Sequence, residues 1–179
     1  MGGTFLLSAF SLTHYLMMAE AQEADEIFVH MGGDQVVPLN VMRVRIDKSV
    51  KIIPEGAFQY CSRLSYVEFH DGIERIERYA FHDCGGYCFM RSIRLLGVKV
   101  IEREAFASSS LVDVEFGDKL ETLQEWAFSN SSLRSITMPS VRTIGRSAFM
   151  GCEWLEDLEL PEGLETLNEY YMLSITANV

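Results

Sequence analysis

Positively charged residues are scarce in this sequence. Its 179 residues include 15 Lys and Arg against 26 Asp and Glu, for a formal net charge of −11, and none of the basic residues lies before Arg43. Proteins that bind nucleic acids or anionic membranes gather Lys and Arg on one face, because phosphate groups must be neutralised. The composition therefore argues against both kinds of partner, and we predict no nucleic-acid binding.

Cysteine is also scarce, with four residues at positions 61, 84, 88 and 152. That number is too small for a disulfide-dense secreted scaffold, and no two CxxC units are present to form a structural zinc site. Cys84 and Cys88 form a CxxxC pair with only His82 nearby as a further ligand. We therefore predict reduced, buried thiols, no metal site and no cofactor.

Long apolar runs are absent as well. The stretch from Phe5 to Met18 has about 14 residues, includes Ser, Thr and His, and falls short of the roughly 20 apolar residues of a membrane span. As a signal peptide it would be cleaved after Ala19-Glu20-Ala21, but the basic leading region is missing. As a folded helix it would cover one end of a repeat array. The helix is the preferred interpretation, which slightly favours an intracellular protein over a secreted one. The apolar stripe of that helix would consist of Phe5, Ala9, Leu12 and Leu16.

Motifs of enzymes are missing too. The four histidines form no HExxH motif, and no Ser or Cys lies in a sequence that marks an activated nucleophile. The carboxylates are spread along the chain, so no pair is expected in one desolvated pocket. We predict that the protein is not an enzyme.

What the sequence does contain is an internal repeat. An Ala-Phe pair recurs at steps of 23, 25, 22 and 21 residues, with aliphatic residues five and eight positions before each Phe. Each pair is followed by two apolar residues that alternate with polar ones, as in a β-strand. The pairs are Ala57-Phe58, Ala80-Phe81, Ala105-Phe106, Ala127-Phe128 and Ala148-Phe149, and the alternating residues are Val67/Phe69, Ile93/Leu95, Val114/Phe116, Ile136/Met138 and Leu158/Leu160.

The repeat predicts a right-handed solenoid of about five to six coils, each of 21 to 25 residues. Each coil would contain one short strand, paired in parallel on one face, and a short helical or 3₁₀ return segment around the Ala-Phe pair. Stacking would place the phenylalanines in one column of the core. We expect an N-terminal segment at 1–25, a lead-in at 26–43, repeats at 44–172 and a tail at 173–179.

The repeat resembles that of BspA-type leucine-rich repeat proteins, whose unit is similar to I-x-x-x-A-F-x-x-C-x-x-L-x-x-V-x-L-P. The resemblance runs from about Val44 to Met172 and implies a binding or adhesion role without fixing a partner. It weakens at the insertion 85–90 and in the last coil, where Tyr171-Met172 replaces Ala-Phe. The residues that carry it most directly are Ile53, Ala57, Phe58, Cys61, Leu64, Val67 and Phe69, and Ile144, Ala148, Phe149, Cys152, Leu155, Leu158, Leu160 and Pro161.

The outward strand positions are the predicted binding site, because the strands of a solenoid line one continuous face. Tyr66 and Arg94 are of the types that most often anchor interfaces. In the insertion GGYCFM, Tyr87 and Phe89 form a second candidate contact. The predicted partner-binding residues of the strand face are Arg45, Tyr66, Glu68, His70, Arg94, Asp113, Glu115, Thr137 and Glu159.

Two functions are compatible with these features. The first is a non-enzymatic module that binds another protein through the strand face, or a glycan in a surface-adhesion variant. The second is a structural subunit that self-associates through the solenoid ends, where apolar side chains and backbone groups would be unpaired.

Overall fold

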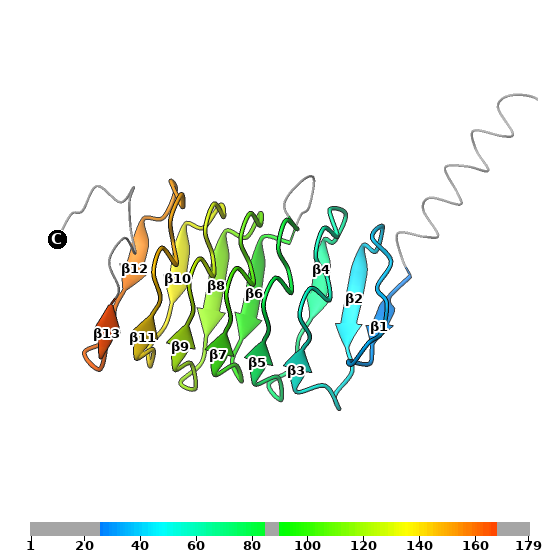
Figure 1. Ribbon diagram of the computed structural model, residues 1–179, viewed down its shortest axis with the longest axis horizontal. Helices are drawn as coiled ribbons and strands as arrows, with labels where there is room; N and C mark the ends of the chain where they lie inside the picture. Colours follow the sequence, from blue (N-terminus) through cyan, green and yellow to red (C-terminus); the bar gives the residue numbers. More distant parts are fainter. Residues whose placement is uncertain (1–25, 85–89, 168–179) are drawn as a thin grey trace, which may run out of the picture.

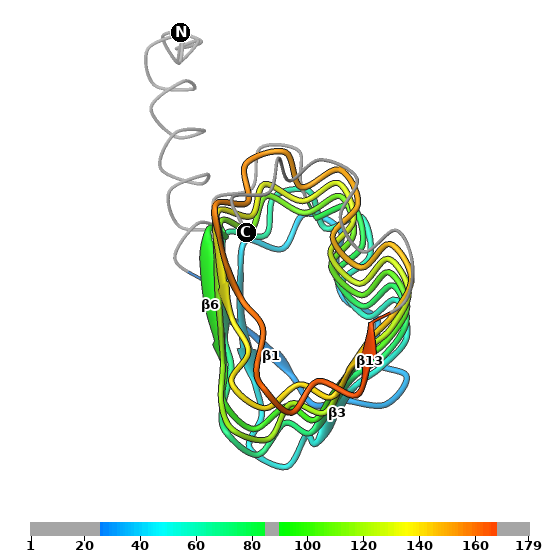
Figure 2. The same cartoon turned by 90° about the vertical axis from the view of Figure 1, so that its left-hand side faces the viewer.

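The computed structural model describes residues 26–84 and 90–167. They form one solenoid whose coils stack along a single axis (Figure 1). Seen along that axis, the coils superpose as an oval with strands on two of its sides (Figure 2). The predicted repeat solenoid is therefore confirmed.

The front ladder of strands carries the alternating residues of the repeat, and neighbouring strands within each of its sheets pair in parallel. Val44, Val67, Ile93, Val114 and Ile136 point inward and are buried, as the alternation predicted. The ladder consists of β1 (Phe28–His30), β2 (Arg43–Ile46), β4 (Tyr66–Glu68), β6 (Ser92–Leu95), β8 (Asp113–Phe116), β10 (Ser135–Thr137) and β12 (Asp157–Glu159).

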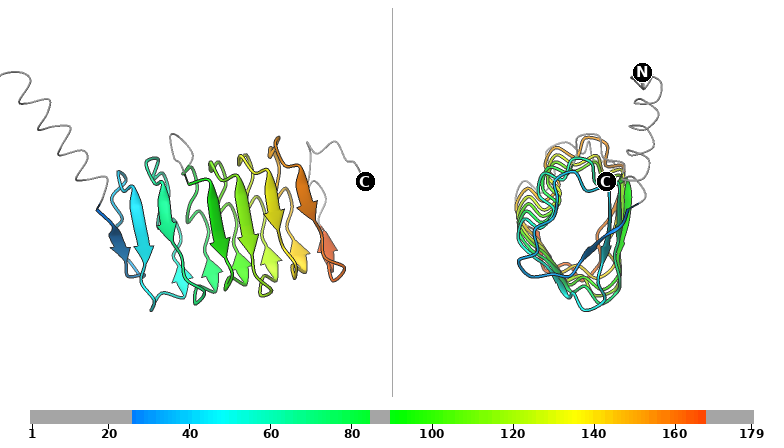
Figure 3. Two further views of the ribbon diagram at one scale, coloured as in Figure 1. Left: turned by 180° about the vertical axis from the view of Figure 1, so that it is seen from behind. Right: turned by 90° about the vertical axis from the view of Figure 1, so that its right-hand side faces the viewer.

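A second ladder of two-residue strands lies on another side of the oval (Figure 3), although the repeat predicted only one strand per coil. It is formed by the aliphatic residue five positions before each Phe together with the residue preceding it. Both ladders are parallel, so each coil contributes two strands rather than one. The back ladder consists of β3 (Ile52–Ile53), β5 (Arg75–Ile76), β7 (Val100–Ile101), β9 (Thr122–Leu123), β11 (Thr143–Ile144) and β13 (Thr166–Leu167).

The predicted helical return segments were wrong, because the described residues around each Ala-Phe pair form turns. Residues two before and two after each Phe have positive φ, which interrupts a right-handed helix. The amides of the first four phenylalanines donate instead to the next coil, as from Phe58 N to Ala80 O at 2.8 Å. The residues with positive φ at these positions are Gly56, Tyr60, Tyr79, Asp83, Glu104, Ser108, Trp126, Asn130, Ser147 and Gly151.

The core is organised by the column of stacked phenylalanines that the repeat predicted. Ring centroids of successive residues lie 4.9 Å apart from Phe58 to Phe81, 5.1 Å to Phe106, 5.2 Å to Phe128 and 6.0 Å to Phe149. All five side chains are buried. Each coil thus covers the apolar surface of the next, which one coil cannot do alone.

Three cysteines, Cys61, Cys84 and Cys152, are buried in the core, as predicted. The thiol of Cys84 donates to Phe58 O at 2.9 Å and that of Cys152 to Phe128 O at 3.1 Å. The cysteines that follow Phe81 and Phe149 therefore each satisfy a carbonyl of the preceding coil. Cys88 lies outside the described residues.

The front ladder is interrupted at the sequence insertion. Residues 85–89 lie between β4 and β6, and these two strands belong to separate sheets of three and four strands. The back ladder continues past the insertion as one six-stranded sheet, because β5 pairs with β7. The insertion therefore divides the front face while the back ladder keeps the coils in register.

Candidate interaction surface

The outward side chains of the front ladder form a row of cross-strand pairs. Arg45 Nε lies 3.1 Å from Glu68 Oε2, across the β2–β4 pairing. Arg94 makes two hydrogen bonds to Glu115, at 2.7 and 3.2 Å, across the β6–β8 pairing. These four side chains are half to two-thirds exposed. Each pair therefore remains accessible to solvent while its geometry is fixed by the strands.

Tyr66 lies on β4, two residues before Glu68 of the first ion pair, and is 46% exposed. The guanidinium carbon of Arg43 is 5.6 Å from its ring centroid, a cation–π contact across the β2–β4 pairing. The ring is thus held against β2 on the same face as Arg45. Tyr66 therefore lies beside the point where the front ladder divides into two sheets, because β4 borders the interruption.

His70 was predicted to face a partner, and its ring makes one hydrogen bond to the preceding coil and one within its own turn. Nε2 lies 3.0 Å from Asp47 O, and the amide of Gly72 donates to Nδ1 at 3.1 Å. Because Nδ1 accepts a hydrogen bond, these contacts fit the tautomer that carries its hydrogen on Nε2. Both ring nitrogens have protein partners, and binding of another molecule would compete with them.

The remaining predicted residues lie on the second half of the front face. Asp113 accepts a hydrogen bond from Ser135 Oγ at 2.9 Å. Thr137 and Glu159 are exposed at neighbouring positions of β10 and β12. The two predicted insertion residues, Tyr87 and Phe89, lie outside the described residues. The front ladder therefore exposes eight of the nine side chains predicted for it: Arg45, Tyr66, Glu68, Arg94, Asp113, Glu115, Thr137 and Glu159.

An aromatic turn cluster beside the Ala-Phe pairs was missed by the sequence analysis. The rings of Tyr60 and Tyr79 meet that of His82 edge-on, at centroid distances of 6.1 and 5.4 Å. The guanidinium of Arg103 lies over the ring of Trp126 at 4.6 Å. A sequence signal existed, because large aromatics occupy repeat positions that hold small residues in other coils.

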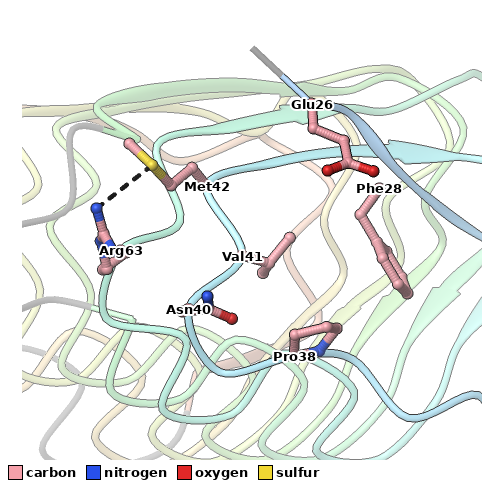
Figure 4. Close-up of a pocket in the computed structure, with 7 residues that line it drawn as sticks. All are labelled: Glu26, Phe28, Pro38, Asn40, Val41, Met42 and Arg63. Atoms are coloured by element: carbon pink, nitrogen blue, oxygen red, sulfur yellow. Dashed lines mark hydrogen bonds between the residues drawn. The ribbon is translucent and has the colours of Figure 1, made fainter. Parts of the chain in front are cut away.

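A cavity of about 250 Å³ lies at the N-terminal end of the solenoid (Figure 4). Arg63 Nη2 is 3.7 Å from Met42 Sδ at one side, and Glu26 lies at the other. The polar side chains are spread around an apolar wall and no two of them converge on one point in Figure 4. The lining residues are Glu26, Phe28, Pro38, Asn40, Val41, Met42 and Arg63.

Within residues 26–84 and 90–167, no group of three or more His, Cys, Asp or Glu side chains is arranged to hold a metal ion. The same residues include no helix with the length and apolarity needed to cross a bilayer. The chemistry that this part of the chain offers at its surface consists of ion pairs, hydroxyl groups and aromatic rings.

Known proteins share this architecture. The family model described as BspA type leucine rich repeat region matches six copies, over residues 38–88 and 86–177. A crystal structure of a leucine rich cell surface protein from Faecalibacterium prausnitzii A2-165 is 28% identical, with a TM-score of 0.57. The match covers 66% of this chain and 32% of that protein, so the chain corresponds to about a third of its length. No curated protein matches the sequence.

Proposed function

The chain belongs to the BspA type leucine-rich repeat family, and we propose that it is a non-enzymatic module that binds another protein through its front face. The observation that carries the proposal is the position of Tyr66, which is 46% exposed on β4 beside the solvent-accessible Arg45–Glu68 pair, while a second accessible pair, Arg94–Glu115, joins β6 and β8. Tyrosine and arginine dominate the binding energy of many interfaces. A side chain already held in place loses little conformational entropy on binding.

The charges of the front face constrain the partner. Arg43 and Arg45 lie on β2, whereas Asp113 and Glu115 lie on β8 and Glu159 lies on β12. A partner of complementary charge would present acidic groups over β2 and basic groups over β8 to β12. Such an arrangement fixes the orientation of the partner and raises its association rate. Binding should therefore weaken as salt concentration rises.

Affinity capture with a designed variant tests this proposal. The variant carries Tyr66→Ala, Arg94→Glu and Glu115→Arg, which removes the ring and reverses one ion pair without breaking it. The matched control carries Tyr60→Ala, Lys99→Glu and Glu74→Lys, because Lys99 and Glu74 form an ion pair at 2.7 Å beside the back ladder. Circular dichroism establishes that both variants fold. A partner retained by the wild type and the control, but not by the front-face variant, supports the proposal.

Capture of the same partner by all three proteins would contradict binding through the front face. A glycan partner, as in adhesion, would be released by periodate oxidation of the bait-bound material and not by proteolysis. That result would favour the surface role of the Faecalibacterium protein, which is described as a cell surface protein.

Self-association through the solenoid ends is a second candidate, favoured by the distribution of exposed apolar residues. Among the described residues, ten large hydrophobic side chains are exposed, and eight of them lie before residue 53 or after residue 153. The most exposed are Val36, Leu39 and Trp154. Light scattering coupled to size-exclusion chromatography tests this function. A mass of one chain at all concentrations would exclude it, and a mass that rises with concentration and falls in Leu39→Ser would support it.

A further inference from the structure

The imidazole of His30 closes the N-terminal end of the phenylalanine column. Its side chain is 0% exposed, and its ring meets that of Phe58 at a centroid distance of 5.0 Å and an angle of 64°. Only residues 31–42 separate β1 from β2, so this first coil has no Ala-Phe pair of its own. His30, from the last position of β1, therefore occupies the end of the column.

Both ring nitrogens of His30 are buried and lack a hydrogen-bond partner. The neutral ring leaves one N–H and one acceptor unsatisfied, whereas the protonated ring would bury two donors and a positive charge. Burial accordingly lowers the pKa of His30 from its usual value of 6.5. The buried site of His30 therefore favours the neutral imidazole over the charged imidazolium.

No charged group on the surrounding elements compensates a proton on His30. Arg45 is bound to Glu68 on the outer face, and the carboxylate of Asp47 accepts hydrogen bonds from the amide and hydroxyl of Ser49. Asp47 interacts with the ring only indirectly, since its amide donates to His30 O at 2.9 Å. The charged residues on the elements around His30 are Glu26, Asp34, Arg43, Arg45, Asp47 and Glu55, of which Arg43 and Asp47 are partly buried and the others are exposed.

The first coil has few other attachments to the solenoid. β1 has three residues and, among the described strands, pairs with β2 alone. In the segment that follows, Met31, Val36 and Leu39 are exposed. Segments with little buried surface and few backbone hydrogen bonds open at a small free-energy cost. The coil is therefore held mainly by the burial of His30, Val37 and Val41, with Phe28 partly buried beside them.

We propose that residues 28–41 form a pH-sensitive cap, which detaches from Phe58 when His30 is protonated in mildly acidic solution while the following coils remain folded. The open coil binds one proton more than the closed coil, because the open imidazole has its ordinary affinity for protons. Linkage then requires that closure weakens as pH falls below the ordinary pKa of histidine. The closed cap is fully favoured above that pH.

Hydrogen–deuterium exchange of the full chain between about pH 7.5 and pH 5 tests the proposal, with each rate divided by the intrinsic rate at that pH. In the wild type, protection of the amides of β1 should fall, approaching about tenfold per pH unit below pH 6.5, which is the limit for one proton. Amides beside Phe106 should keep their protection. His30→Phe, which extends the column, and His30→Leu should show no such pH dependence.

The matched controls are His70→Asn and His82→Asn, which should retain the loss of protection. If His30→Phe cannot be packed, His30→Leu supplies the same comparison with a smaller side chain. Loss of protection that persists in both His30 variants would overturn the proposal. A first coil that is unprotected in the wild type at about pH 7.5 would overturn it too, because no closed cap would then exist.

Discussion

Phe106 is the residue whose truncation should damage the solenoid most. Its side chain is fully buried, and its ring stacks on both neighbours, at 5.1 Å on Phe81 and 5.2 Å on Phe128, with interplanar angles of 1° and 3°. Phe→Ala in a core costs about 3–5 kcal/mol through lost transfer energy and the cavity left behind. Two stacked pairs place Phe106→Ala at the upper end of that range. The loss is a large fraction of a domain's typical stability of about 5–15 kcal/mol.

Urea unfolding followed by circular dichroism measures this effect. With a slope of about 2 kcal/mol per M, the midpoint of Phe106→Ala should fall by about 2 M. Phe149→Ala is the matched control, because among the described residues its ring has one stacked neighbour, at 6.0 Å. We expect a smaller loss there, of about 3 kcal/mol. A loss below about 1 kcal/mol for Phe106→Ala, or one no larger than for Phe149→Ala, would refute the stacked-column reasoning.

Three further predictions concern close packing, thiol chemistry and the surface. Gly97→Ala should lower the free energy of unfolding by at least about 2 kcal/mol, because the added Cβ would overlap the carbonyl of Asp71. Gly163→Ala is the control and should leave the free energy unchanged in the same urea assay, because a Cβ added there has no other atom within 4 Å. Burial raises the pKa of Cys152, so in a Cys88→Ser background a thiol reagent at pH 8 should label no cysteine until urea unfolds the chain. Early labelling would show that these sites open. Glu115→Ala removes an exposed ion pair and should change stability by less than about 1 kcal/mol, which thermal unfolding can check.

The fold could be predicted because each coil repeats the same burial requirement. The spacing of Ala-Phe pairs and the alternation around Val67 and Val114 specify which side chains point inward, and these are buried in the structure except for Ala57 and Phe69, which are partly buried. The back ladder was missed because a strand of two residues, such as Ile76 with Arg75, is too short for alternation to be visible. The turns were mistaken for helices because residues such as Tyr79 and Trp126 have positive φ, which is unusual for residues other than glycine.

The candidate surface could be predicted only in part. Period-two alternation correctly placed Tyr66, Arg94 and Glu115 on one exposed face. It could not show that Arg94 and Glu115 bind each other, because that contact depends on the register between strands 21 residues apart. His70 follows its strand, where alternation no longer applies, and its ring turns back to Asp47. Contacts between coils are the part of the structure that a single repeat does not contain.

Charged residues also help to specify the register between coils. They lie immediately before each strand of the back ladder. This position alternates in sign along the whole ladder, and Lys99 Nζ lies 2.7 Å from Glu74 Oε2. That contact lowers the pKa of Glu74 and raises the pKa of Lys99. If a back strand paired with the strand two coils away instead of its neighbour, each of these residues would lie opposite a like charge, which is unfavourable. The hydrophobic repeat alone permits this error because every coil has the same core residues, so the alternating charges supply the discrimination between neighbouring coils. The residues are Lys51, Glu74, Lys99, Glu121, Arg142 and Glu165.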